Sequence, residues 1–252
     1  MVLTFLFFSG IAIGSFLNVL IDRLPQERSI NGRSVCDNCH HQLAWYDLLP
    51  LVSFILLKGK CRYCNNKIPS VLPFVEILTG VIFVSIWLSI EKTPVEKIIY
   101  LGIMACLIVI FFADAKYKII PDSIQVALLI FSFLLFYVGN ADLRSLPNQI
   151  LSGFFVMLPI LLIYLATKGR GMGFGDVKFS FIIGLLLGTI SGFLALYIAF
   201  VIGAVIGVIL ILAKKKKLKN TIAFGPFLVL GLGIMLVWGE KVIEWARKIY
   251  GL

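Results

Sequence analysis

The chain has 252 residues, of which 60% are hydrophobic and only 14% are charged. A soluble domain is near half apolar and a quarter charged, so this composition excludes an ordinary soluble protein. The formal net charge is +10. The basic residues lie in a few loops between apolar runs rather than on an aromatic-rich basic surface, which argues against nucleic-acid binding.

Long apolar runs predict an all-α integral membrane protein with about eight transmembrane helices, because a helix needs roughly 20 such residues to cross a bilayer. Continuous runs without alternation favour helices over a barrel. The first run lacks a basic leader and a small-residue cleavage site, so we expect a retained helix rather than a signal peptide. The expected spans are residues 2–20, 73–90, 98–113, 124–138, 150–167, 177–187, 193–212 and 222–238, the sixth being short.

Basic residues concentrate in alternate loops, which gives the expected orientation. Seven lie between the first two spans, and further groups follow the third, fifth and seventh spans, the last being the run 214–219. The positive-inside rule places these loops in the cytoplasm and both termini outside. We expect the 214–219 run to anchor this topology, with binding of anionic lipid or substrate as the alternative.

Two short segments complete the expected layout. The stretch 188–192 begins and ends with glycine and predicts a turn between the sixth and seventh spans. In the tail 240–250, Val242, Trp245 and Ile249 share one helical face. That pattern predicts a helix lying at the membrane surface.

Four of the five cysteines form two Cys-x-x-Cys pairs in the first basic loop, at Cys36 and Cys39 and at Cys61 and Cys64. Two residues between ligands let one turn present both sulfurs, and four thiolates are common ligands of structural zinc. The alternative of two disulfides conflicts with a reducing cytoplasm. We therefore expect a structural Zn²⁺ site in a small cytoplasmic domain, whose folding depends largely on the metal.

Other chemically reactive side chains have competing interpretations. His40 and His41 adjoin the first cysteine pair and could replace a thiolate, or they are simply exposed. Cys106 lies mid-span, where we expect a small buried apolar residue. Glu76 is an acid within the second span, and such residues tend to be functional. It could shape a substrate groove or have a structural partner such as a lysine.

Three aspartates lie where apolar runs meet the basic loops, at Asp114, Asp122 and Asp176. By the expected topology all three are at the cytoplasmic face. Asp122 follows Pro121 and suits a helix N-cap, and Asp176 could be a cap as well. Asp114 has the weakest structural explanation, because an acid near a helix C-terminus opposes the helix dipole.

Asp114 and Asp176 form a candidate catalytic pair. Two carboxylates in different environments can act as general acid and general base on one shared water. Such a pair could hydrolyse a peptide bond without a metal or a covalent nucleophile. The glycines before Asp176 would let backbone or substrate approach closely.

Five sequence motifs are spread over nearly the whole chain. They are Gly14-Ser15-Phe16-Leu17-Asn18-Val19 with Arg23-Leu24-Pro25, the paired-cysteine loop with Trp45-Tyr46-Asp47 and Gly59-Lys60-Cys61-Arg62, Pro73-Phe74-Val75-Glu76, Asp114 followed by Ile120-Pro121-Asp122, and Gly173-Phe174-Gly175-Asp176-Val177-Lys178. In this order they resemble the type IV prepilin leader peptidases, the bacterial branch of the GxGD aspartyl proteases.

The resemblance implies that Asp114 and Asp176 are the catalytic residues. They would cleave the basic leader of type IV pilins and type II secretion pseudopilins after a glycine, at the cytoplasmic face of the bacterial inner membrane. Many family members also methylate the new N-terminus with S-adenosylmethionine, an activity associated with the N-terminal region and the cysteine loop. The spacing of residues does not identify those that bind the methyl donor.

The expected domains are a first transmembrane helix at 1–22, a cytoplasmic tetra-cysteine zinc domain at 23–70, and a polytopic membrane peptidase domain with seven further helices at 71–252. Prepilins, pseudopilins and membrane lipid are the expected partners, with no nucleic acid. Two alternatives remain open. One is a peptidase without methyltransferase activity, and the other is a proton-coupled transporter, although no inverted repeat supports it.

Overall fold

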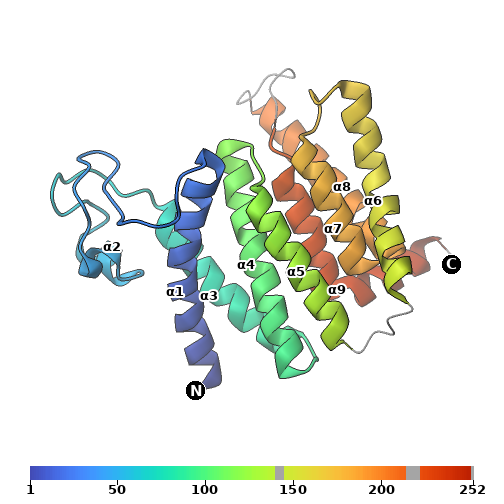
Figure 1. Cartoon of the computed structure of the whole chain (residues 1–252), viewed down its shortest axis with the longest axis horizontal. Coiled ribbons are helices and arrows are strands. Elements are labelled where there is room, and N and C mark those ends of the chain that lie inside the picture. Colours follow the sequence, from blue (N-terminus) through green and yellow to red (C-terminus); the bar gives the residue numbers. More distant parts are fainter. Residues whose placement is uncertain (140–144, 214–221, 251–252) are drawn as a thin grey trace. The chain divides into compact units, whose positions relative to one another are not determined.

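The structure is a computed structural model, and the residues that it describes are 1–139, 145–213 and 222–250. Within these ranges the chain is helical and contains no strand, only the isolated bridges Val35↔Gln42 and Lys60↔Lys67. This confirms the expected all-α fold (Figure 1). The helices are α1 (Val2–Arg23), η1 (Leu24–Gln26), η2 (Trp45–Leu48), α2 (Val52–Leu56), α3 (Val71–Ser89), α4 (Pro94–Tyr117), α5 (Asp122–Val138), α6 (Leu146–Thr167), α7 (Phe174–Leu187), α8 (Thr189–Leu212) and α9 (Gly225–Tyr250).

The lengths of these helices agree with a multi-pass membrane protein. In the described part of the chain, α1, α3, α4, α6, α8 and α9 are long and apolar enough to cross a membrane. Helix α5 is apolar with 17 residues, and α7 has 14 residues. At 1.5 Å per residue α7 is about 21 Å long, shorter than a hydrocarbon core of about 30 Å. The described residues thus confirm a multi-pass helical protein with six helices of membrane-spanning length, while α5 and α7, two of the eight expected spans, are shorter than that.

Local sequence signals explain where α4 begins and ends. The N–H of Glu96 donates to the Thr93 hydroxyl at 3.3 Å, and the N–H of Thr93 donates to Glu96 Oε2 at 3.0 Å, which is a capping box. The helix stops at Lys118, whose φ of 57° is left-handed. Because α4 continues to Tyr117, beyond the expected end at residue 113, Asp114 lies within its last turn.

One further boundary differs from the sequence expectation, and another agrees with it. The turn expected over 188–192 is wrong in extent, because only Gly188 leaves the helix, with a φ of 78°, and α8 begins at the next residue. The tail 240–250 is helical, as expected, and follows a kink at Trp238, where the backbone is non-helical and the two helical parts of α9 meet. The basic run 214–219 and the side chain of Ile249 lie outside the described residues.

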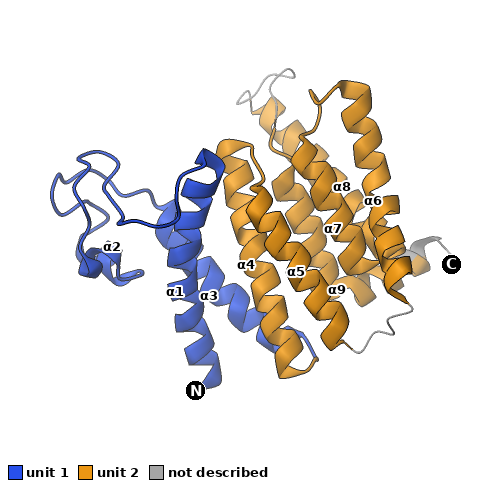
Figure 2. Cartoon of the chain, viewed as in Figure 1, with its two compact units in different colours: residues 1–91 blue, residues 92–252 orange. Residues whose placement is uncertain are grey.

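The chain divides into two compact units, Met1–Glu91 and Lys92–Leu252 (Figure 2). In the first unit α1 packs along α3, and the cysteine loop connects them. Glycines let the two backbones meet, since a Cβ on Gly10 would lie 2.7 Å from Gly80 Cα. The domain expected to start at residue 71 thus differs from the second unit, because α3 packs with α1 in the first.

The second unit is a bundle of α4 to α9, in which α6 packs on α7, α8 on α9, and α4 on both α5 and α9. Helix α7 crosses α6 closely: a Cβ on Gly184 would lie 2.6 Å from the Ser152 carbonyl oxygen and 2.8 Å from Gly153 Cα. Small residues at such crossings are typical of membrane helices. The α4–α5 and α6–α7 links lie at one end of this unit, at the top in Figure 1.

We predict that Gly184→Ala destabilises the second unit by about 1–3 kcal/mol, because the added methyl group would overlap the α6 backbone. Gly233→Ala in α9 is the matched control, since no atom lies within 4 Å of the Cβ that it adds. Thermal unfolding of both purified variants in detergent measures the difference. Equal melting temperatures would contradict the close α6–α7 crossing.

Candidate active site and metal centre

Asp114 lies in the last turn of α4 with its side chain buried, at 6% exposure. Its Oδ2 accepts a hydrogen bond from the backbone N–H of Gly225 at 2.8 Å. Gly225 is the first residue of α9, so the carboxylate also faces the positive end of that helix dipole. A Cβ on residue 225 would lie 2.7 Å from the same Oδ2. Glycine is therefore required at this position for the contact.

Asp176 is the third residue of α7 and is also 6% exposed. Its Oδ2 accepts the N–H of Gly173, the N-cap residue, at 3.1 Å. Gly175 lets α7 approach the segment before α5, since a Cβ there would lie 3.2 Å from Ile120 Cβ. The glycine-rich segment thus holds Asp176 inside the unit, and the residue is not itself the N-cap.

The carboxyl groups of Asp114 and Asp176 are close enough to interact electrostatically. Each uses Oδ2 for its backbone contact, and no hydrogen-bond donor in the described ranges reaches either Oδ1. Like charges in a buried site oppose joint ionisation. A pair in which one acid is protonated and the other ionised suits the activation of a water molecule.

Two polar residues at the start of α5 lie next to this site. Asp122 is the first residue of the helix and Pro121 is its N-cap, so the expected capping role of Asp122 is wrong. Its exposed carboxylate accepts a hydrogen bond from Lys178 Nζ at 2.8 Å, which ties α5 to α7. Gln125 is buried at 4% exposure, and neither polar atom of its side chain has a partner among the described residues.

The sequence reasoning missed Gln125 and Gly225. The Gln125 Nε2 lies 3.7 Å from the position of a Cβ on Gly175, and a buried amide of this kind needs a partner such as an ordered water. In the sequence, a glutamine in the first turn of an apolar helix could have identified Gln125 as a candidate site residue. For Gly225, the signal was a Gly-Pro pair before an apolar run.

The four cysteines of the first unit form one cluster. Their Sγ atoms all lie within 4.8 Å of one another, and none is in a disulfide. The Cys36 and Cys64 sulfurs are 3.8 Å apart, which is the spacing of two thiolates bound at about 2.3 Å to one tetrahedral zinc ion. The cluster could therefore hold a metal ion.

Two turns of the same design present the sulfurs. The N–H of Cys36 donates to the His41 carbonyl at 3.0 Å, and the N–H of Cys61 donates to the Asn66 carbonyl at 2.8 Å. Each turn contains one residue with left-handed φ, at His40 and Asn65. The two Cys-x-x-Cys segments, whose spacing suggested metal binding, thus fold into turns with the same backbone hydrogen bonds.

Contacts between side chains hold the second turn to η2 and join it to the first turn. Asp47 accepts hydrogen bonds from Arg62 Nε at 2.7 Å and from the Tyr63 hydroxyl at 3.3 Å. The His41 ring stacks on Tyr63, with centroids 3.8 Å apart. This contact gives His41 a structural role, and among the described residues the metal-binding group contains cysteines alone. Cys106 is buried within α4, as expected.

The thiols of the cluster differ in acidity. Hydrogen bonds from the Asn66 backbone and the Asn38 side chain lower the pKa of Cys64 to about 6. The His41 backbone N–H lowers the pKa of Cys39, but partial desolvation and the neighbouring thiols of Cys36 and Cys64 raise it to about 11. Sulfurs this close therefore cannot all become thiolates without a nearby cation, which agrees with a metal-binding donor set.

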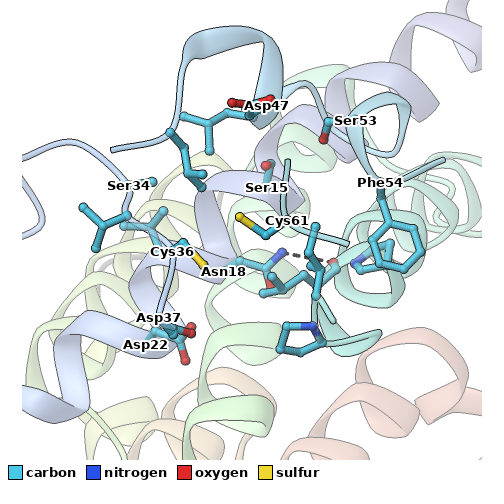
Figure 3. A pocket seen from close by; sticks show the side chains of 18 of the residues that line it. Ser15, Asn18, Asp22, Ser34, Cys36, Asp37, Asp47, Ser53, Phe54 and Cys61 are labelled. Carbon is cyan, nitrogen blue, oxygen red and sulfur yellow. Dashed lines mark hydrogen bonds between the residues drawn. The ribbon is translucent and has the colours of Figure 1, made fainter. Parts of the chain in front are cut away.

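A cavity of about 610 Å³ lies in the first unit between the end of α1, the cysteine loop and the start of α3 (Figure 3). Glu76, the intramembrane acid of the second span, lines it, and its Oε2 accepts the backbone N–H of Leu51 at 2.8 Å. Glu76 therefore has a backbone partner rather than the lysine considered from the sequence. The volume falls within the range of small-molecule sites.

Comparisons with known proteins give the same division of the chain. The Bacterial Peptidase A24 N-terminal domain matches residues 8–90, and the Type IV leader peptidase family matches residues 101–208. The prepilin leader peptidase/N-methyltransferase of Aeromonas salmonicida is 30% identical over 273 residues, which cover 96% of this chain and 92% of that protein. Proteins of the same name from Vibrio cholerae and Klebsiella pneumoniae are each 31% identical, covering 71% and 73% of this chain and 75% and 85% of their own lengths. No solved structure matches the chain significantly.

The first family match ends at residue 90, beside the end of the first unit at Glu91. The second match includes both aspartates of the candidate pair. Similarity to the Aeromonas protein extends over almost the full length of both chains. The chain therefore belongs to the type IV leader peptidase family, as a relative of the prepilin leader peptidase/N-methyltransferases.

Proposed function

We propose that this protein removes the basic leader of type IV prepilins and pseudopilins and then methylates the new N-terminus. Membership of the family supports both activities. The observation that carries the peptidase proposal is the pair of buried carboxyl groups on α4 and α7, which are close enough to interact. A transporter has no comparable support.

Asp114 and Asp176 act as a general acid–base pair in this proposal. The ionised member takes a proton from a water molecule as the water oxygen attacks the scissile carbonyl carbon. The protonated member gives its proton to the departing peptide nitrogen. The backbone N–H groups of Gly225 and Gly173 each hold one carboxylate oxygen, which leaves the other oxygen of each acid for the water.

The site is assigned to the cytoplasmic face of the bacterial inner membrane. The last turn of α4 and the first turn of α7 adjoin loops that belong to the basic, cytoplasmic set. The expected peptidase domain at 71–252 is accordingly narrowed to the second unit, with methyl transfer assigned to the first. This division follows the two family matches.

The cysteine loop is proposed as a structural zinc domain, with Cys36, Cys39, Cys61 and Cys64 as ligands. Four thiolates leave no coordination position for water, so the ion would stabilise the loop rather than catalyse hydrolysis. S-adenosylmethionine would supply the methyl group to the amine that leader cleavage exposes. A peptidase without methyltransferase activity is the alternative that the experiments below separate.

We predict that Asp114→Asn and Asp176→Asn each lower leader cleavage at least about a hundredfold, because each removes one half of the acid–base pair. Co-expression with a type IV prepilin, followed by intact-mass measurement, reports both cleavage and the added methyl group. Asp122→Asn is the matched control, since its carboxylate is exposed and pairs with Lys178. Wild-type cleavage by either variant of the pair would refute the assignment.

Gly225→Ala is expected to lower kcat/KM for cleavage about tenfold or more, although it retains the N–H. The added Cβ would lie 2.7 Å from Asp114 Oδ2 and force that carboxylate to move. Gly233→Ala changes the same helix where space is open and should keep normal kinetics. Unaltered kinetics for Gly225→Ala would show that this contact does not position Asp114.

For the cysteine loop we predict one bound zinc per chain, lost in Cys61→Ser because a hydroxyl is a poor substitute for a thiolate ligand. Loss of the metal should expose the loop to trypsin at Lys58, Lys60 and Arg62. Cys106→Ser is the matched control, since Cys106 is buried in α4 outside the cluster. Metal analysis and limited proteolysis measure both effects, and a Cys61→Ser protein that retained its zinc would contradict the ligand set.

A further inference from the structure

We propose that the cavity of the first unit binds S-adenosylmethionine, and that Glu76 supplies the negative charge that recognises a cationic group of this ligand. The inference rests on the proposed methyltransferase function, for which it names the donor site. It concerns the residues of this cavity alone and is independent of the aspartate pair.

The walls of the cavity match the mixed chemistry of the methyl donor. S-adenosylmethionine combines an adenine ring, ribose hydroxyls, a carboxylate and two cationic groups, the sulfonium and the α-ammonium. Apolar side chains that can cover a ring line one set of surfaces, namely Val19, Leu43, Leu48, Leu51, Phe54 and Leu72. Acidic and basic side chains line other surfaces of the cavity. Figure 3 shows Asp22 and Asp37 on one side of the cavity and Asp47 on another.

Some of the charged side chains in the cavity wall already have partners. Asp47 is satisfied by Arg62 and Tyr63 and has a side chain only 2% exposed. Arg23 donates to backbone carbonyls of the loop, at Ser29, Ile30 and Arg33. These residues hold the loop in shape, so they are weaker candidates for binding a ligand.

Glu76 differs from these residues. It is buried at 7% exposure and accepts the Leu51 N–H at 2.8 Å. No lysine or arginine of the described residues forms an ion pair with it. A carboxylate buried beside a cavity without a cation is costly, and a cationic ligand in the cavity would remove that cost.

The turn that Glu76 holds is strained. Leu51 has φ 59° and ψ −45°, and the N–H of Val52 donates to the Pro50 carbonyl two residues earlier, at 2.6 Å. This is the conformation of a γ-turn of the rare, strained kind. Strained residues cluster where a ligand is held, and Leu51 forms part of the cavity wall.

The metal-binding loop also contributes to the cavity, since Cys36 and Cys61 line it. Asn18 of α1 lines the same cavity (Figure 3), and its side-chain amide donates to the Leu72 carbonyl of α3 at 3.1 Å. A folded loop is therefore required to complete the walls. The proposed zinc ion would therefore support binding of the methyl donor by keeping the loop folded.

Calorimetric titration of S-adenosylmethionine into the full-length, zinc-loaded protein in nanodiscs tests the proposal. Glu76→Gln should raise Kd about tenfold or more, because it removes a charge-assisted contact while its amide oxygen still accepts the Leu51 N–H. Val19→Phe should also weaken binding by filling the cavity. Glu91→Gln is the matched control, since this exposed acid lies in the same unit but outside the cavity.

Zinc content and melting temperature, measured on each variant, identify those whose loop is intact. Intact Glu76→Gln and Val19→Phe proteins that bind S-adenosylmethionine as tightly as wild type would overturn the site. A wild-type protein that cleaves prepilin but binds no S-adenosylmethionine would overturn this inference and leave the peptidase proposal standing. Binding without cleavage would support the site and refute the peptidase.

Discussion

A carboxyl group inside a bundle of apolar helices needs a hydrogen-bond donor, and the second unit supplies the buried carboxyl groups of Asp114 and Asp176 with one backbone N–H each. Asp114 receives that of Gly225 and Asp176 that of Gly173. Both donors are glycines. At residue 225 a side chain would collide with the acid itself, so the catalytic proposal depends on a backbone that comes directly against a carboxylate.

Glycines also let the helices of each unit pack closely against one another. Lipid offers no hydrophobic driving force between helices, so close van der Waals contact between small residues replaces it. Gly184 brings α7 against the backbone of α6, and Gly175 brings its first turn against Ile120. In the first unit Gly10 and Gly80 do the same for α1 and α3. These crossings determine where the polar ends of the helices lie.

The cysteine loop is stabilised differently. Between residues 24 and 70 only Cys61 is buried, so the loop has no apolar core of its own. Two turns with matching hydrogen bonds converge on four sulfurs. The His41–Tyr63 ring contact links the turns, and the Asp47–Arg62 ion pair holds the second turn to η2. A bound metal ion would therefore stabilise the folded loop, as side-chain packing stabilises the helices. Because the loop also forms part of the wall of the cavity at Glu76, the proposed methyl-donor site depends on the proposed zinc site.

The sequence by itself determined the membrane class, the approximate helices, the paired-cysteine cluster and the family, because these follow from local features such as run length and two-residue spacing. It also selected Asp114 and Asp176. Tertiary structure alone decided that Asp122 pairs with Lys178 rather than capping α5, and that α3 belongs with α1. It alone placed Gly225 against Asp114, 111 residues away. Such contacts depend on which helix ends meet, and that is set by the close crossings of several helices rather than by any one segment of the chain.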